Sequence, residues 1–238
     1  MENRYGVNEG KEKMVESRGK RFECYAVRTT VVTEEDLLED IIDEFVMPVL
    51  YREDIVFISE KMIACTEGRA YPVDEINPGF FATLLSRFVT RSVHGIGLAI
   101  PETMQCAIHE AGLPRILLAA FAGGVGRLFS KKGWFYVIAG KKVAAIDGPC
   151  SCTLPPYNHY VVLAPEAPER TAKRISRMLG GNTVLIVDAN DLGCEILGMS
   201  DRLMDVGFYK ELLKQNPLGQ EAQCTPIGIL RPITKKIK

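Results

Sequence analysis

The amino-acid sequence predicts an α+β fold, with mixed β-sheets and flanking helices. Short apolar runs rich in β-branched residues, such as 55–58 and 184–187, predict strands. Longer stretches with apolar residues at helical spacing, such as 101–111 and 168–179, predict helices between the strands. The length of 238 residues is enough for one large domain or for two small lobes.

Composition predicts where the domain begins. Residues 1–21 mix lysine, arginine and glutamate with few large apolar groups, which is typical of a mobile N-terminal tail outside the fold. Residues 22–238 are expected to form the domain, with an inserted helical segment near 78–132. The sequence contains no internal repeat.

The first elements follow from alternation and capping. Apolar and polar residues alternate over 22–32 well enough to predict a strand. Thr33 and two following glutamates predict the start of a helix over 37–45, whose apolar residues share one face. Two apolar runs, 55–58 and 62–65, then predict two strands joined by a charged turn.

The inserted segment is expected to be helical. Phenylalanine and leucine recur at helical spacing over 77–89, and a loop follows. Pro101 suits a helix start and Gly112 a helix stop. Another helix is expected over 114–129. Its glycine run at 123–126 lacks the lysine and hydroxyl of a phosphate-binding loop, so close helix packing is the better interpretation.

The remaining elements are mostly strands. Residues 134–138 and 142–146 are expected to be strands separated by a turn at Gly140. The pattern weakens near the end, where it predicts a short helix at 209–214 and a last strand at 227–230.

Between them lies a predicted β-α-β unit. It consists of a strand over 160–163, a helix over 168–179 and a strand over 184–187. Strands joined through a helix are usually parallel, so we expect these two to be parallel neighbours.

Composition also excludes several classes of function. The formal net charge is −1, so nucleic-acid binding is not expected. Seven irregularly spaced cysteines and the lack of a signal-peptide core favour the reducing cytoplasm, and disulfides are not expected. Cys150 and Cys152 are the only close pair, which argues against structural zinc. The longest apolar stretch, 116–125, is too short to span a bilayer, so no membrane partner is expected.

Residues 54–69, D-I-V-F-I-S-E-K-M-I-A-C-T-E-G-R, are the most informative segment, because charged groups interrupt an apolar run. Glu60 and Lys61 fall where a sheet ends or bends. The segment closes with a carboxylate, a permissive backbone position and a guanidinium, namely Glu67, Gly68 and Arg69. A lysine and arginine pair suits an anionic substrate, especially a phosphate. A β-hairpin with a solvated turn explains the same residues.

A second motif follows in the C-terminal half, V-V-L-A-P-E-A-P-E-R-T-A-K-R-I from residue 161 and T-V-L-I-V-D-A-N-D up to residue 191. In this order the two motifs resemble those of the coenzyme F-420 gamma-glutamyl ligase family, V-V-S-S-K-I-V-S-x-A-E-G-R, then V-L-L-P-x-D-P-x-x-S-A-x-x-I and I-x-T-D-S. Glu60 replaces the second serine of the first motif. The resemblance covers roughly residues 22–200 and implies a gamma-glutamyl ligase-like fold, built as one domain or as two intertwined lobes.

The resemblance implies a metal site at strand ends. Asp188 occupies the place of the metal-binding aspartate of I-x-T-D-S, and Asn190 and Asp191 follow it. Ligands bind beyond the carboxyl ends of strands in such sheets, although a strand-end aspartate also caps turns. The family's other metal-binding aspartate aligns with Cys150. Either Asp147, three residues earlier, supplies the carboxylate or the metal site is incomplete.

Other residues have two interpretations each. Glu67 either joins the metal shell or pairs with Arg69. Tyr157 and Asn158 follow two prolines next to the expected site, and they either recognise substrate or serve the turn. The three histidines form no recognisable nucleophile arrangement, so a serine or cysteine hydrolase is not expected.

Taken with the resemblance, these residues imply a carboxylate-amine ligase that depends on a nucleotide, GTP or ATP, and on Mg²⁺ or Mn²⁺, and that forms an amide bond through an acyl phosphate. The expected catalytic residues are Lys61 and Arg69, and the expected metal ligands are Asp147, Asp188 and Asn190. The nucleotide or substrate is expected to contact Glu60, Glu67, Gly68, Tyr157, Asn158 and Asp191. The family also implies a cytoplasmic homodimer that acts on a small carboxylate and a glutamate-like amino acid. The alternatives are a relative that binds nucleotide or metal without catalysis, and a protein that shares only the fold.

Overall fold

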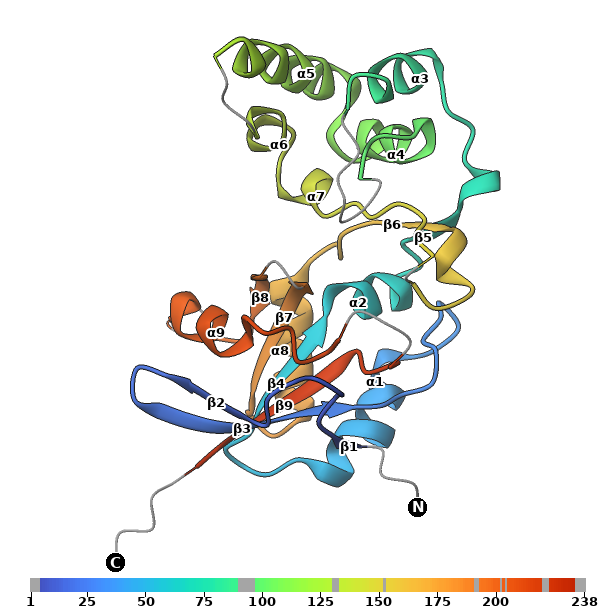
Figure 1. Ribbon diagram of the computed structural model, residues 1–238. Coiled ribbons are helices and arrows are strands. Elements are labelled where there is room, and N and C mark those ends of the chain that lie inside the picture. Colours follow the sequence, from blue (N-terminus) through green and yellow to red (C-terminus); the bar gives the residue numbers. More distant parts are fainter. Residues whose placement is uncertain are drawn as a thin grey trace, which may run out of the picture. The chain divides into compact units, whose positions relative to one another are not determined.

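The computed structural model describes residues 5–89, 97–129, 133–151, 153–190, 193–201, 203, 205–219 and 223–233. The chain forms two compact units, coloured along the sequence in Figure 1. Unit 1 consists of Met1–Glu67 and Pro165–Lys238, and unit 2 consists of Gly68–Ala164. The chain leaves unit 1 once and returns to it, so unit 2 is an insertion between its two halves. The fold is α+β, as predicted.

A mixed sheet forms the centre of unit 1 (Figure 1). In the described part of the chain the sheet has seven strands in the order β1-β3-β9-β4-β7-β8, with β2 paired to β3. The β4–β7 pair is parallel, and the other described pairs are antiparallel. The strands are β1 Tyr5–Gly6, β2 Met14–Ser17, β3 Lys20–Val27, β4 Ile55–Ser59, β7 Thr183–Asn190, β8 Gly193–Met199 and β9 Ile227–Pro232.

Helices pack on both faces of this sheet, which explains its apolar central strands. Val56 and Ile58 of β4 belong to a buried cluster that includes Ile175 of a helix, whereas Phe57 packs with Leu212 on the other face. Alternate residues of a strand point to opposite faces, so a strand covered on both sides is apolar throughout. The helices are α1 Leu38–Ile41, continued by a π-helix Ile42–Val46 and a 3-10 helix Met47–Val49, then α2 Glu60–Thr66, α8 Pro168–Met178 and α9 Val206–Leu213.

Unit 2 is mostly helical and has its own core. Antiparallel strands β5 Ala70–Pro72 and β6 Tyr160–Val162 lie at its two ends in sequence. The core includes the fully buried Met104, Ile116 and Val161. The helices are a 3-10 helix Val73–Glu75, α3 Phe80–Ser86, α4 Pro101–Ala111, α5 Leu113–Leu128, α6 Trp134–Ala139, α7 Lys141–Ala144 and a 3-10 helix Tyr157–His159.

Among the described residues, no single helix has the length and apolar composition to cross a membrane. α4 and α5 taken together reach that length and composition, but the pair is bent by 116°.

The predicted helices of the inserted segment are confirmed. Pro101 is the first residue of α4, and Gly112, with φ of 82°, follows the last. The glycine run 123–126 lies inside α5. A Cβ atom at Gly123 would lie 3.2 Å from Cβ of Phe135 in α6, which is closer than ordinary van der Waals contact. Close helix packing therefore explains Gly123, as predicted.

Three predicted strands are helical instead. Residues 62–65 belong to α2, which starts at Glu60 directly after β4, so the predicted β-hairpin is wrong. Residues 134–138 belong to α6, and 142–146 include the end of α7. Aromatic and β-branched residues favour strands locally, but packing of α6 against Gly123 of α5 outweighs that preference.

The predicted β-α-β unit is wrong in its pairing. β6 pairs antiparallel with β5 in unit 2, whereas β7 pairs parallel with β4 in unit 1. The chain returns to unit 1 after Ala164, before α8 begins, so β6 and β7 belong to different sheets. The other neighbour of β7 is β8, an antiparallel strand that the sequence pattern did not predict.

Residues 5–21 differ from the mobile tail that the composition of residues 1–21 predicts. β1 and β2 lie within this segment, and both pair with β3. The hydroxyl of Tyr5 in β1 accepts a hydrogen bond from Nη1 of Arg231 at 2.9 Å. Short edge strands with charged side chains are common in β-sheets, so the same composition fits both a tail and a sheet edge.

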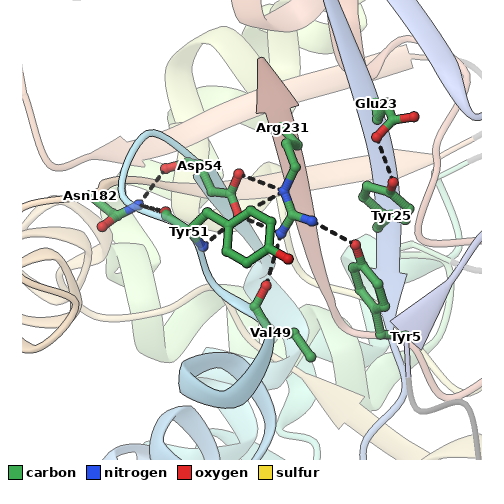
Figure 2. A network of polar contacts seen from close by, with 8 residues as sticks. All are labelled: Tyr5, Glu23, Tyr25, Val49, Tyr51, Asp54, Asn182 and Arg231. Carbon is green, nitrogen blue, oxygen red and sulfur yellow. Dashed lines mark hydrogen bonds and ion pairs between the residues drawn. The ribbon is translucent and has the colours of Figure 1, made fainter. Parts of the chain in front are cut away.

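A polar network holds β9 against the turn that precedes β4 (Figure 2). Arg231 of β9 donates hydrogen bonds to Asp54, from Nε to Oδ1 at 3.0 Å and from Nη2 to Oδ2 at 2.7 Å. Nη2 also donates to the Val49 carbonyl at 2.8 Å, and the guanidinium lies 3.7 Å from the ring centroid of Tyr51. Asp54 is only 2% exposed. Its hydrogen bond raises the pKa of Arg231, so the guanidinium stays charged.

Candidate functional site

The carboxyl ends of β4 and β7 bring predicted site residues to one edge of the sheet. The two strands are parallel, and Ser59 of β4 pairs with Val187 of β7. Glu60 and Lys61 follow Ser59 as the first residues of α2, while Asp188 follows Val187 within β7. Parallel strands of one sheet end at the same edge, which is where such sheets commonly bind ligands.

The candidate residues also share a face of the sheet. Val184 and Ile186 of β7 lie in the same buried cluster as Met62 of α2, so α2 packs on that face. Asp188 and Asn190 continue the alternation of Val184 and Ile186 and therefore point to the face that carries α2. We define the β4–β7 edge as Glu60, Lys61, Asp188 and Asn190.

Exposure differs among the residues of the β4–β7 edge. Glu60 is 3% exposed, Asp188 and Asn190 are partly buried, and Lys61 is exposed. A buried carboxylate, a partly buried carboxylate and an amide oxygen are the ligand types of hard cations. The exposed ammonium group of Lys61 is suited to bind an anion, such as a phosphate, that such a cation would accompany.

A cysteine lies beside Asp188 but remains a neutral thiol. Cys194 of β8 pairs with Ala189 of β7. Burial, together with the negative charges of Asp188 and Glu195, raises the pKa of Cys194 to about 12. Since the thiolate is the reactive form, Cys194 is a poor nucleophile at neutral pH.

The Glu67-Gly68-Arg69 sequence crosses the boundary between the two units. Within unit 1, Oε2 of Glu67 accepts a hydrogen bond from the backbone N–H of Glu166 at 2.7 Å. Gly68 has φ of 65°, a conformation that favours glycine. The chain leaves and re-enters unit 1 near Glu67 and Glu166, so this contact joins the two crossing segments.

Arg69 makes an equivalent connection within unit 2. Its Nε donates to the Ala164 carbonyl at 2.6 Å, and its Nη2 donates to Oε1 of Glu110 at 2.8 Å. The side chains of the Arg69–Glu110 pair are only 16% and 15% exposed. The ion pair of Arg69 is thus with Glu110 of α4, whereas the sequence suggested Glu67 as one interpretation. These contacts give Arg69 a structural role beside any role in catalysis.

The other predicted site residues lie in unit 2. Asp147 forms an isolated antiparallel bridge with Val162, with two backbone hydrogen bonds of 2.9 Å. The Tyr157 ring packs edge-on against Tyr160 at 5.2 Å between centroids. Asn158 is the middle residue of the 3-10 helix Tyr157–His159.

Asn158 also lines a cavity of about 970 Å³ within unit 2. Asp74, Glu102 and His159 contribute polar groups to the same cavity, together with four prolines. The Asn158 Oδ1 atom is buried and accepts no hydrogen bond within the described residues. A buried oxygen of this kind is a natural acceptor for a ligand, which keeps substrate contact open as the role of Asn158.

The predicted metal ligands are divided between the units. Asp188 and Asn190 belong to unit 1, and Asp147 belongs to unit 2, so their joint site stays a prediction. Within the part of the chain that the structure describes, no group of three or more histidine, cysteine, aspartate or glutamate side chains is arranged to hold a metal ion. Asp191 lies outside the described residues.

Cys150, which aligns with an expected metal-binding aspartate, is disulfide-bonded. The expectation of a chain without disulfides is therefore wrong. A sulfur in a disulfide provides no thiolate, so Cys150 does not replace the aspartate as an anionic ligand. Disulfides are uncommon in the reducing cytoplasm, so the cytoplasmic location also stays a prediction. The free cysteines among the described residues are Cys24, Cys65, Cys106, Cys194 and Cys224.

Sequence reasoning missed the partners of the first motif. Glu166, which bonds Glu67, and Ala164, which bonds Arg69, both belong to the second motif, V-V-L-A-P-E. The presence of both motifs in one chain was the signal that could have predicted this contact. Glu110 stands 41 residues from Arg69 in a helix of ordinary composition, and no local pattern distinguishes it.

A comparison with known families matches most of the chain. The family model described as F420-0:Gamma-glutamyl ligase matches residues 26–195. The matched span contains both motifs, the β4–β7 edge and all of unit 2, and it ends before α9 and β9. The comparison with curated proteins found no match.

Proposed function

The chain belongs to the F420-0:gamma-glutamyl ligase family, and on that premise we propose that it is a nucleotide- and metal-dependent carboxylate-amine ligase. In the proposed reaction, a carboxylate oxygen of the acid attacks the terminal phosphorus of GTP or ATP and releases the nucleoside diphosphate. The amine nitrogen then attacks the carbonyl carbon of the acyl phosphate. Phosphate leaves, the nitrogen loses a proton, and an amide remains.

The observation that carries the proposal is the parallel pairing of β4 with β7. This pairing puts Glu60 and Lys61 at the same edge of the sheet as Asp188. A ligase of this type needs cations against the triphosphate and a positive group near the transferred phosphoryl group. Oxygen donors and a lysine at one strand edge support that need.

The donor set of the β4–β7 edge fits a hard cation. Asp188 and Asn190 offer oxygen atoms on one face of β7, and we propose that they hold Mg²⁺ or Mn²⁺, with Asp147 as a further ligand from unit 2. The ion would supply positive charge against the phosphates. Asp191 extends the same segment and would contact the nucleotide or the substrate.

Positively charged side chains have the complementary role. We propose that Lys61 contacts the phosphate or the anionic substrate, since its side chain is exposed at the β4–β7 edge. We propose that Arg69 contacts the same phosphate or anionic substrate, and that Glu67 and Gly68 hold the turn beside it. Glu60 would orient Lys61 or the substrate.

The acid and amine are proposed to be a small carboxylate and a glutamate-like amino acid, bound in part by Tyr157 and Asn158. The buried acceptor oxygen of Asn158 supports this assignment, because an ammonium group is a hydrogen-bond donor. A cytoplasmic homodimer, as the family resemblance implies, completes the proposal. A relative that binds nucleotide without turnover is the alternative, favoured by the disulfide at Cys150 and by Glu60 in place of a serine.

The proposal is tested by thermal unfolding with GTP or ATP, with and without Mn²⁺. A ligand at about 100 times its Kd stabilises the folded state by roughly 2.7 kcal/mol, which raises the Tm by roughly 5–10 °C in a chain of this size. Asp188→Asn should lose the metal-dependent part of the shift. Asp43→Asn, which changes an exposed carboxylate in the π-helix of unit 1, is the matched control and should keep it.

Each outcome has a distinct meaning. A metal-dependent shift, together with release of nucleoside diphosphate and a new amide by mass spectrometry, supports the ligase. Binding without any amide across a panel of acids and amines supports the alternative. If neither nucleotide shifts the Tm, both the ligase and the non-catalytic relative are excluded, and only a shared fold remains.

A further inference from the structure

Helix α5 has an unusual distribution of apolar residues. One face is buried in the core of unit 2 and includes Ile116 and Ala119. The opposite face is also apolar, although it is exposed. Its large side chains are 40% to 83% exposed, and they are Leu117, Leu118, Phe121 and Leu128. The outer face of a helix in a globular protein is normally polar, and a helix that is apolar all round is normally covered by protein or lipid.

Helix α6 packs against α5 and also has exposed apolar side chains. Gly123 of α5 approaches Phe135 of α6 closely, and Nε of Arg115 donates to the Ile138 carbonyl at 2.7 Å. The two helices therefore pack side by side in unit 2, as Figure 1 shows. Val137 is 80% exposed, and Trp134 and Tyr136 are each 38% exposed. We define the α5–α6 face as Leu117, Leu118, Phe121, Leu128, Phe129, Trp134, Tyr136 and Val137.

The charged residues of the segment that forms α5, α6 and α7 have one sign. Residues 112–146 contain six lysines and arginines and not one aspartate or glutamate. Four of the six are described and exposed, namely Arg115, Arg127, Lys141 and Lys142. Unit 2 as a whole contains nine basic and five acidic residues, a formal net charge of +4, whereas the whole chain carries −1. The charge pattern thus predicts an anionic partner for an apolar surface.

We propose that unit 2 binds the surface of an anionic lipid bilayer through the α5–α6 face. Exposed aromatic and aliphatic side chains would enter the boundary between headgroups and acyl chains, and the surrounding lysines and arginines would contact anionic headgroups. Trp134 and Tyr136 are of the residue types that gather at this boundary. The proposal goes beyond the ligase reaction and does not depend on it.

The geometry favours lying on the bilayer over crossing it. α5 has 16 residues, which at about 1.5 Å per residue is roughly 24 Å and shorter than a hydrocarbon core of about 30 Å. Its bend of 116° from α4 prevents the pair from forming one straight span. The sequence analysis expected no membrane partner because no segment is long enough to cross, but surface binding has no such requirement.

Charge also distinguishes a bilayer from a second copy of the chain. In a two-fold dimer through this surface, the same patch faces itself. Arg115, Arg127, Lys141 and Lys142 of one copy would then approach the same residues of the other, and like charges across an interface are unfavourable. An anionic bilayer instead presents the opposite charge.

The single tryptophan of the chain lies on the proposed surface and provides a local signal. The full-length protein is titrated with vesicles of phosphatidylcholine containing 30% phosphatidylglycerol, or of phosphatidylcholine alone. We expect a blue shift of Trp134 emission, and quenching by brominated lipid, with the anionic vesicles. Binding should weaken at least tenfold in 0.5 M salt, because salt screens the headgroup attraction.

Two variants test the two halves of the surface. Phe121→Ser with Leu128→Ser removes exposed apolar groups, and Lys141→Glu with Lys142→Glu reverses exposed charges. Each pair should weaken binding to anionic vesicles at least tenfold. Matched controls in unit 1 are Leu37→Ser with Leu203→Ser, which are 64% and 95% exposed, and Arg28→Glu with Lys214→Glu, both exposed. Both controls should bind as the unchanged protein does.

The proposal is overturned if the unchanged protein does not bind the anionic vesicles. It is also overturned if the variants and controls bind equally well. Light scattering tests whether a second copy of the chain covers this surface instead. The surface would belong to a second copy if the unchanged protein is a dimer, Phe121→Ser with Leu128→Ser is a monomer, and neither form binds vesicles.

Discussion

Arg69→Gln tests whether the arginine of the E-G-R sequence holds unit 2 together. The substitution keeps a polar side chain but removes the charge that pairs with Glu110 and the Nε–H that binds the Ala164 carbonyl. Glu110 is left as a largely buried carboxylate, with its side chain 15% exposed. We expect unit 2 to be destabilised, because the residue before its first strand loses its side-chain bonds to Glu110 of α4 and to the Ala164 carbonyl.

The size of the effect follows from burial. Removing one partner of a buried ion pair costs roughly 3–5 kcal/mol, since the other charge stays buried. The pair retains 16% and 15% exposure, which leaves some hydration and favours the lower end of that range, about 3 kcal/mol. With a urea m-value of roughly 2–3 kcal/mol/M, the unfolding midpoint should fall by about 1 M.

The assay is urea unfolding followed by Trp134 fluorescence, which reports on unit 2 alone because the chain has one tryptophan. The double variant Arg69→Gln with Glu110→Gln leaves no uncompensated charge and should recover most of the lost stability. A midpoint that moves by less than about 0.2 M in Arg69→Gln would refute the structural reasoning. A double variant that is stable but inactive would assign Arg69 a direct role with the substrate as well.

Three further changes test the structure of the chain. Asp54→Asn leaves the Arg231 guanidinium without its bidentate partner and should lower the free energy of unfolding by roughly 3 kcal/mol. Circular dichroism in urea measures this free energy, and an unchanged value would contradict the importance of the network in Figure 2. Gly198→Ala should lower the free energy of unfolding by roughly 3 kcal/mol, because its Cβ would lie 2.3 Å from the carbonyl carbon of Pro168. Gly124→Ala has open space at its Cβ and should stabilise α5 by up to about 1 kcal/mol. Equal effects of the two substitutions on Tm would count against this packing. Arg18 and the Phe208 N–H lower the pKa of Asp205 below its ordinary value of 3.8. The folded state therefore binds this proton less tightly than the unfolded state, so the contribution of Asp205 is present above pH 3.8 and is lost as the pH falls further. Asp205→Asn should flatten the loss of stability as the pH falls below 3.8, and an identical acid profile would show that the Arg18 contact contributes nothing.

Local signals determined several elements from sequence alone. Pro101 and Gly112 mark the two ends of α4 because proline fits the first turn of a helix and glycine tolerates the positive φ that follows the last turn. The continuous apolar run of β4 predicts a strand buried on both faces, and helices do cover both. The α+β class and the family follow from such patterns, since each depends on residues that are neighbours in sequence.

Pairing between distant segments was decided only by the tertiary structure. The strand-like run 134–138 became α6, since its packing against Gly123 of α5 outweighs β preference. The parallel partner of β7 is β4, more than a hundred residues away, because the chain inserts the whole of unit 2 between them.

The candidate site divides in the same way. Lys61 and Asp188 were found from their motifs, which are contiguous in sequence. Their presence at one edge depends on the parallel β4–β7 ladder, and the ion pair of Arg69 with Glu110 depends on where α4 packs. Residue types and short spacings are properties of the sequence, whereas the meeting of side chains from separate elements is a property of the packed core, because only packing sets which distant segments become neighbours.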